Sequence, residues 1–253
     1  MNAAAATQPR RIGLFGAIRI TVRLMAIAAL LLACQPLYYL FHALRLKNPW
    51  PRRFLGSLGW IAGVRLKVEG ERPRPGAFLI ANHVSWIDIP AIAAVTGTAF
   101  VGHDGLSSTP LLKHLCAMND TVFIARHDRT SVHTQIADVR RALRDTGALT
   151  IFPEGTTSDG TGLLPFKSSL LSALEPVPQG VSVVPVLLDY GEEAADIAWI
   201  GTEHGVANFL RVLARRRNVG LTVRFLPALE GDQLRDRKTM SFAARETILA
   251  ALH

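Results

Sequence analysis

His83 and Asp88 are the two residues of this chain whose types and spacing best suit acid–base chemistry. Residues five positions apart lie about 140° apart around a helix, so the two side chains can meet only if His83 precedes the helix that holds Asp88. Ser85 as the N-cap, with Asp88 three positions later, predicts that arrangement. Asp88 would then bind one ring nitrogen of His83 and leave the other to act as a general base. A plain capping box, with His83 an ordinary loop residue, explains the same spacing.

A second loop with chemical potential is the run Phe-Pro-Glu-Gly-Thr-Thr-Ser-Asp-Gly at 152–160. It offers backbone N–H groups and hydroxyl donors to an anion, although the same composition is typical of a simple turn. Lys167-Ser168 follows Gly162 by five positions, but the second glycine of a nucleotide-binding phosphate loop is missing, which excludes that interpretation. The histidines lack the spacing of a metal site, so we predict no metal.

Both loops follow apolar segments that are typical of buried strands. Strands are predicted at residues 64–69, 77–81, 99–102, 121–125, 148–152, 181–188 and 221–225. A helix is predicted at 132–143, where apolar residues fall on one face and a glycine follows. Strands that alternate with helices predict an α/β domain with helices on the faces of a sheet.

The excess positive charge lies beside the most apolar part of the chain. Residues 1–80 hold 12 basic and 2 acidic side chains, whereas residues 81–253 hold 16 basic and 18 acidic ones. This distribution disfavours a nucleic-acid-binding domain and favours contact with an anionic lipid surface. A segment rich in proline and arginine at 48–53 marks a boundary, so we predict a membrane anchor at 1–48 and a globular domain at 49–253.

The form of the anchor has three interpretations. Residues 25–44 carry no charge and are long enough to cross a bilayer as one helix. Pro36 and the equal basic flanks favour instead a re-entrant hairpin or an interfacial helix, with Arg19 and Arg23 on its polar face. An export signal that ends in a lipidated Cys34 is disfavoured because the apolar character continues beyond that residue.

Four blocks together resemble the motifs of the glycerolipid acyltransferase family, which includes 1-acylglycerol-3-phosphate acyltransferases. The blocks are His83-x4-Asp88, Val-Phe-Ile-Ala-Arg at 122–126, Phe-Pro-Glu-Gly-Thr at 152–156 and Val-Val-Pro-Val at 183–186. The resemblance covers about residues 60–230. It implies a mixed sheet flanked by helices, an acyltransferase domain at 49–253, and transfer of a fatty acyl group from a thioester to the free hydroxyl of a lysolipid.

The resemblance also implies a role for each matching residue. His83 would be the general base and Asp88 its orienting partner, with no covalent acyl-enzyme and no cofactor. The acceptor would be bound by Arg126, Glu154, Gly155, Thr156, Thr157 and Lys167. The donor would be a thioester of acyl-carrier protein or coenzyme A. The enzyme would act on the bacterial inner membrane, with its catalytic domain on the cytoplasmic side.

Departures from the family pattern leave the acceptor open. Thr157 stands where the third block usually has arginine, and His103 replaces a basic residue found after an earlier strand. We expect 1-acyl-sn-glycerol-3-phosphate as the acceptor, with lyso-ornithine lipid as the alternative. A thioester hydrolase of the α/β type is disfavoured because no G-x-S-x-G motif occurs. A non-enzymatic lipid-binding scaffold is the remaining rival.

Overall fold

The structure, a computed structural model, describes residues 12–103, 110–124, 137, 141–143 and 146–252. Within these ranges seven strands form one sheet in the order β1-β7-β6-β2-β5-β3-β4. The strands are β1 (Val64–Glu69), β2 (Ala77–Ala81), β3 (Ala99–His103), β4 (Val122–Ile124), β5 (Ala148–Ile151), β6 (Ser182–Asp189) and β7 (Val219–Phe225). Neighbouring strands are parallel except for β6 and β7, so the mixed sheet expected above is confirmed.

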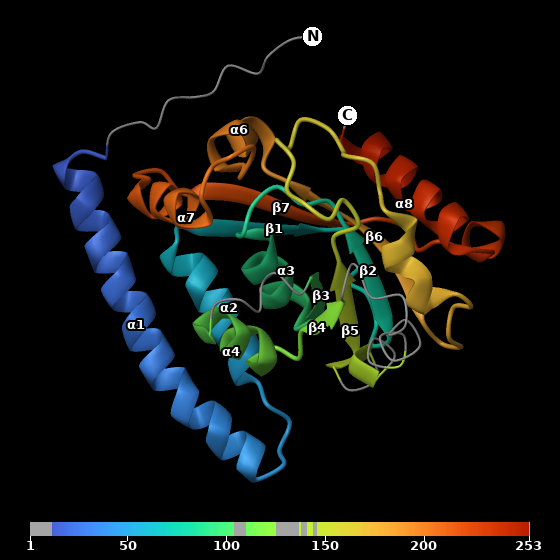
Figure 1. The fold of residues 1–253 in the computed structure, drawn as a ribbon, viewed down its shortest axis with the longest axis horizontal. Helices are drawn as coiled ribbons and strands as arrows, with labels where there is room; N and C mark the ends of the chain where they lie inside the picture. Colours follow the sequence, from blue (N-terminus) through green and yellow to red (C-terminus); the bar gives the residue numbers. More distant parts are fainter. Residues whose placement is uncertain (1–11, 104–109, 125–136, 138–140, 144–145, 253) are drawn as a thin grey trace.

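Helices cover both faces of this sheet (Figure 1). They are α1 (Leu14–Ala43), α2 (Trp50–Ile61), α3 (Asp88–Thr96), α4 (Pro110–Met118), α6 (Ala194–Ile197), α7 (Gly205–Ala214) and α8 (Arg237–Leu252), with short 3-10 helices at Ser168–Leu174, Gly191–Glu193 and Gly231–Leu234. The central strand β2 is buried on both faces. Ala77, Leu79 and Ala81 pack in one cluster with α3 and α7, whereas Phe78 and Ile80 pack in another with α8.

The strand predictions agree closely with the observed elements. β1 and β2 begin and end at the predicted residues, and the other strands differ from their predictions by one or two residues at an end. Apolar runs predicted the buried strands such as β2 and β5 because parallel strands covered on both faces need nearly continuous apolar residues, whereas alternating apolar and charged residues predicted β1. The helix predicted at 132–143 lies largely outside the described residues.

The N-terminal helix α1 is 30 residues long and continues through Pro36. The helix therefore has no turn at Pro36, and the re-entrant form of the anchor stays a prediction. The chain turns after α1 instead, and α2 packs back along it. α1 is long and apolar enough to cross a membrane, and only 6% of its most apolar stretch is buried, which indicates membrane association. The predicted boundary at 48–49 falls in the turn between α1 and α2.

Arg19 and Arg23 do not form the polar face of a free amphipathic helix. Arg19 Nη1 donates to the carbonyl of Ala214 at 2.9 Å, and Arg23 Nη1 donates to that of Leu213 at 2.9 Å. These carbonyls belong to the last turn of α7, where main-chain acceptors lack helical partners and carry partial negative charge. The two arginines thus attach α1 to α7 rather than facing lipid headgroups.

Candidate active site

The candidate catalytic groups gather where parallel strands end. β5, β2 and β6 are neighbours in the sheet and run in the same direction. His83 lies just beyond β2, Glu154 just beyond β5 and Tyr190 just beyond β6. The carboxyl ends of parallel strands form the usual position of functional sites in α/β proteins. The topology therefore brings together loops that are distant in the sequence.

His83 and Asp88 form a hydrogen-bonded pair. His83 Nδ1 lies 2.8 Å from Asp88 Oδ2, with 18% of the histidine side chain exposed and none of the aspartate. Because Asp88 acts as an acceptor to all its neighbours, Nδ1 carries the shared proton and Nε2 is left as a base. The meeting of these two side chains, predicted from their spacing, is observed.

Asp88 is held by four donors. Its Oδ2 also accepts the N–H groups of Val84 at 2.6 Å and Ser85 at 2.9 Å, while Oδ1 accepts the Tyr190 hydroxyl. Burial and the Asp88 carboxylate raise the pKa of Tyr190 well above its usual value, so the phenol stays a donor. This set of bonds fixes the carboxylate that orients the imidazole.

The predicted capping box is only half present. Asp88 does bond back to the Ser85 N–H, but the helix N-cap is Ile87. Ser85 Oγ is buried and has no hydrogen-bond partner among the described residues. The tight turn closed by Asp88 N–H on the Ser85 carbonyl places Ser85 one turn before the helix, which explains the difference.

The imidazole plane is fixed by an aromatic stack. The ring of Phe152 lies 4.2 Å from that of His83 at an interplanar angle of 18°, and Phe100 lies 6.1 Å beyond Phe152. Phe152 forms an apolar wall on one face of the base. Such a wall lowers the local dielectric constant and so strengthens the electrostatic interactions of the site.

Glu154 joins the second loop to the first. The side chain is 1% exposed, and its two oxygens accept the N–H groups of His83 at 2.8 Å and Leu164 at 2.9 Å. Ser158 completes the contact, since its N–H and hydroxyl donate to the His83 carbonyl at 2.7 and 3.1 Å. Both carboxylate oxygens of Glu154 thus hold the backbone around His83, and the role in acceptor binding that the resemblance implied stays a prediction.

The buried carboxyl of Glu154 should make stability depend on pH. Burial raises its pKa to about 7. Because the folded state binds this proton more tightly than the unfolded chain, the contribution is complete below pH 4.5 and is lost as pH rises through 7. Glu154→Gln cannot lose that proton. We therefore expect its free energy of unfolding, relative to the wild type, to rise by about 3 kcal/mol between pH 4.5 and 8.

Denaturant titration of the full chain in detergent micelles, followed by tryptophan fluorescence, measures this difference. Glu246→Gln is a matched control because Glu246 is on the exposed side of α8 and its side chain is half solvated. A wild-type-minus-Gln difference that stays constant across the range would show that Glu154 titrates normally.

The other residues predicted to bind the acceptor differ in exposure and in hydrogen bonding. Gly155 adopts a φ of +69°, which allows the sharp turn after β5, and Thr156 is exposed. The hydroxyl of Thr157 donates to the Trp199 carbonyl, and Lys167 is exposed. Arg126 lies outside the described residues. Within the described ranges no group of three His, Cys, Asp or Glu side chains could hold a metal ion.

Tyr190 and Phe152 are site residues whose roles the sequence did not reveal. Phe152 stood in a quoted motif without a role, and Tyr190 follows the apolar strand β6 directly. The sequence signal for Tyr190 is a polar aromatic residue directly after an apolar strand. This signal indicates a site residue only once it is known that the strand lies next to β2 and is parallel to it.

Comparisons with known proteins show the family of this chain. A profile of the acyltransferase family matches residues 65–189. The lyso-ornithine lipid O-acyltransferase of Rhizobium meliloti (strain 1021) is 33% identical over 241 residues, which cover 88% of this chain and 82% of the relative. The 1-acyl-sn-glycerol-3-phosphate acyltransferase of Neisseria gonorrhoeae is 29% identical over 202 residues, 77% of this chain and 78% of the relative.

The crystal structure of the 1-acyl-sn-glycerophosphate acyltransferase of Thermotoga maritima shares the fold. Its TM-score is 0.63 over 94% of this chain and 96% of that chain, at 19% identity. The long match to the Rhizobium relative, together with the profile match that includes His83, Asp88 and Glu154, shows the family. The chain therefore belongs to the acyltransferase family.

Proposed function

We propose that this acyltransferase transfers a fatty acyl group from a thioester donor to the free hydroxyl of a lyso-ornithine lipid. The His83–Asp88 pair is the observation that carries the chemistry. His83 Nε2 removes the proton of the acceptor hydroxyl as its oxygen attacks the thioester carbonyl. The carbon–sulfur bond then breaks, and the leaving thiolate takes the proton from the imidazolium. Asp88 stabilises the positive imidazolium in between.

Two observations favour lyso-ornithine lipid over the phosphate acceptor expected first. The relatives described as lyso-ornithine lipid O-acyltransferases include the Rhizobium protein at 33% identity and a Pseudomonas aeruginosa protein at 31% over 82% of this chain. Thr157 stands where the family pattern has arginine, and its hydroxyl is bonded inward to Trp199. A phosphate would thus lack a cation at this position. The second candidate, 1-acyl-sn-glycerol-3-phosphate, is supported by the Neisseria relative.

Product analysis separates these acceptors. The purified full chain in vesicles receives a labelled acyl thioester, of coenzyme A or acyl-carrier protein, with each lysolipid in turn. We expect ornithine lipid as the main product and little phosphatidate. Phosphatidate alone would make 1-acyl-sn-glycerol-3-phosphate the acceptor, and the absence of both products would favour the scaffold. Thr157→Arg should raise the yield of phosphatidate, with Thr157→Ser as the control that keeps the hydroxyl.

We also propose that α1 lies along the cytoplasmic face of the bacterial inner membrane rather than across it. The helix, about 45 Å long, is attached to the globular part near both ends. Arg19 and Arg23 bind α7, while Gln35 and Tyr39 lie 3.0 and 3.4 Å from Nε2 of His114 on α4. A crossing helix held in this way would pull the polar surface of the domain into hydrocarbon, which costs several kcal/mol for each unsatisfied polar group.

Thiol labelling in intact inverted membranes tests this arrangement. Single cysteines at Ile12 and Arg45, in a chain with Cys34 and Cys116 replaced by alanine, mark the two ends of α1. We expect a membrane-impermeant maleimide to label both positions from the same side. Labelling of only one position before the membrane is permeabilised would show that α1 crosses the bilayer.

A further inference from the structure

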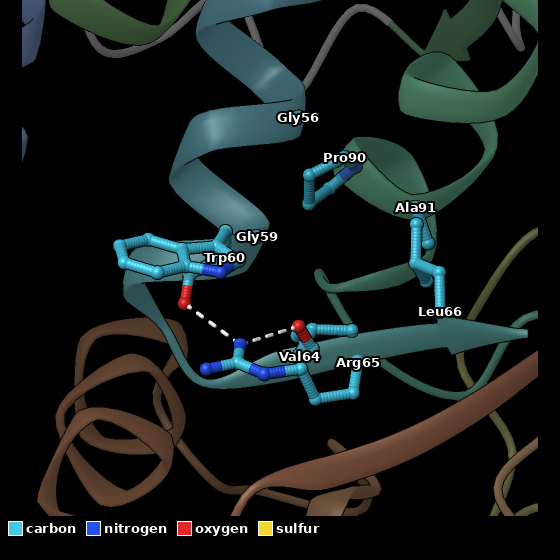
Figure 2. A pocket seen from close by; sticks show the side chains of 8 residues that line it. All are labelled: Gly56, Gly59, Trp60, Val64, Arg65, Leu66, Pro90 and Ala91. Carbon is cyan, nitrogen blue, oxygen red and sulfur yellow. Dashed lines mark hydrogen bonds between the residues drawn. The ribbon is translucent and has the colours of Figure 1, made fainter.

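A small apolar pocket lies between α2, β1 and the first turn of α3 (Figure 2). Its volume is about 200 Å³. Trp60 and two glycines of α2 line it, together with the start of β1 and with Pro90 and Ala91. Since α3 begins at Asp88, the pocket borders the helix that carries one member of the catalytic pair.

Gly56 and Gly59 line this pocket with backbone alone, because they carry no side chain. A Cβ at Gly59 would lie 3.7 Å from the Cβ of Pro90, and one at Gly56 would lie 3.3 Å from that of Ala94. The two helices thus approach closely at the glycines, and beside this contact the space is lined by Trp60 of α2 and by Val64 and Leu66 of β1. The result is an apolar slot that a narrow chain can enter.

The mouth of the pocket combines exposed apolar surface with a fixed cation. Trp60 is 65% exposed and Leu66 38%. The Arg65 guanidinium lies 5.3 Å from the centre of the Trp60 ring. Its Nη1 donates to the carbonyls of Trp60 at 3.3 Å and Val64 at 2.9 Å, as Figure 2 shows.

These contacts orient Arg65 and leave one edge of it open. Nη1 donates to both carbonyl oxygens, and among the described residues Nε and Nη2 make no hydrogen bond. The Nε–Nη2 edge has the geometry that binds phosphate oxygens in a bidentate way. Restricting the side chain in advance reduces the entropy lost when an anion binds.

The mouth is next to the membrane helix. Arg23 Nη2 of α1 lies 3.0 Å from the position of a Cβ at Gly63, in the turn between Trp60 and Arg65. The neighbouring α1 residues Val22 and Met25 are exposed. α1 and the turn that holds the pocket mouth therefore adjoin through Arg23, within the most basic third of the chain.

We propose that this pocket binds one anionic phospholipid of the surrounding bilayer. Its phosphodiester lies on the open edge of Arg65, and a segment of one acyl chain enters the slot beside Gly59. The charge of Arg65, the adjoining membrane helix and the width of the slot favour this lipid class. Because Pro90 and Ala91 contact the inserted chain, the bound lipid supports the first turn of α3. This goes beyond the acyl transfer proposed above, since the lipid is neither donor nor acceptor.

Native mass spectrometry of the full chain released from nonionic detergent tests the proposal. The probes are dioleoyl phosphatidylglycerol and, as the neutral control, dioleoyl phosphatidylcholine. We expect the wild type to retain one phosphatidylglycerol in preference to phosphatidylcholine. Arg65→Gln should weaken this binding roughly tenfold to a hundredfold, as expected for charge-assisted hydrogen bonds. Gly59→Leu should weaken it similarly by filling the slot.

Matched variants separate the pocket from general membrane attraction. Gly59→Ala should bind nearly as the wild type does, because a Cβ meets only an ordinary contact there. Arg216→Gln removes an exposed cation in the turn before β7 and should have no effect. If Gly59→Leu fails to fold, as judged by circular dichroism, the phosphatidylglycerol binding of Arg65→Gln alone tests the proposal. Unchanged phosphatidylglycerol binding in Arg65→Gln, or equal retention of both lipids by the wild type, would overturn the proposal.

Discussion

Replacing His83 with alanine is expected to lower the rate of acyl transfer by roughly 10²- to 10⁴-fold, the usual contribution of a general base. His83 is the partly exposed group whose free ring nitrogen is available to a substrate, while Asp88 is fully buried beneath it. Without the imidazole, the acceptor hydroxyl must attack with its proton still attached. The rate of labelled product formation at saturating donor and acceptor gives the loss directly.

Folding must be kept separate from chemistry in this experiment. His83 stacks on Phe152, and its main-chain groups bind Glu154 and Ser158. The main-chain bonds survive the substitution, so we expect a near-normal unfolding transition for His83→Ala. His83→Gln is a second variant that keeps a planar polar group against Phe152. Wild-type turnover in both folded variants would remove His83 from the mechanism and revive the scaffold hypothesis.

Asp88→Asn should reduce kcat by about 10³- to 10⁴-fold, comparable with the loss seen when the orienting carboxylate of a catalytic triad becomes an amide. The carboxylate accepts bonds from His83, Val84, Ser85 and Tyr190. An asparagine has one oxygen to accept these bonds, and its NH₂ group would face donors. It favours the wrong tautomer of His83 and cannot stabilise the imidazolium.

The split between kcat and KM identifies the role of Asp88. Because the Asp88 side chain is fully buried, KM for the lysolipid should change little while kcat falls. Tyr190→Phe is the matched control, since it removes only the donor to Oδ1 and keeps the bond between Asp88 and His83. A rise in KM at constant kcat for Asp88→Asn would contradict the orienting role and place Asp88 in acceptor binding.

Residues close together in the sequence were sufficient to predict the strand limits and the contact between His83 and Asp88. β2 ended where its apolar run ended, because a strand buried on both faces needs nearly continuous apolar residues, whereas β1 followed the alternation of apolar and charged residues of a half-buried strand. The five-residue spacing of His83 and Asp88 predicted their contact because only a short turn lies between them. The capping arrangement was less well predicted, since the N-cap depends on backbone angles at Ile87 that residue types do not specify.

The N-terminal helix shows the limit of local arguments. Pro36 predicted a break because it removes one backbone donor, yet α1 runs on through it. Arg19 and Arg23 were assigned to a lipid-facing side because they are basic and spaced by one turn. Their actual partners are carbonyls of α7, about 190 residues away in the sequence. Contacts at such a separation leave no periodic signal in either segment.

The sequence by itself determined the α/β class, the approximate positions of the seven described strands and the contact between His83 and Asp88, because each follows from residues close together in the chain. Only the tertiary structure decided the contacts of Glu154 and Tyr190. Glu154 bonds the His83 main chain across 71 positions, and Tyr190 bonds Asp88 across 102. The strand order β5-β2-β6 brings these side chains to one edge of the sheet, where burial removes water as a competing partner. That order results from the packing of the whole domain.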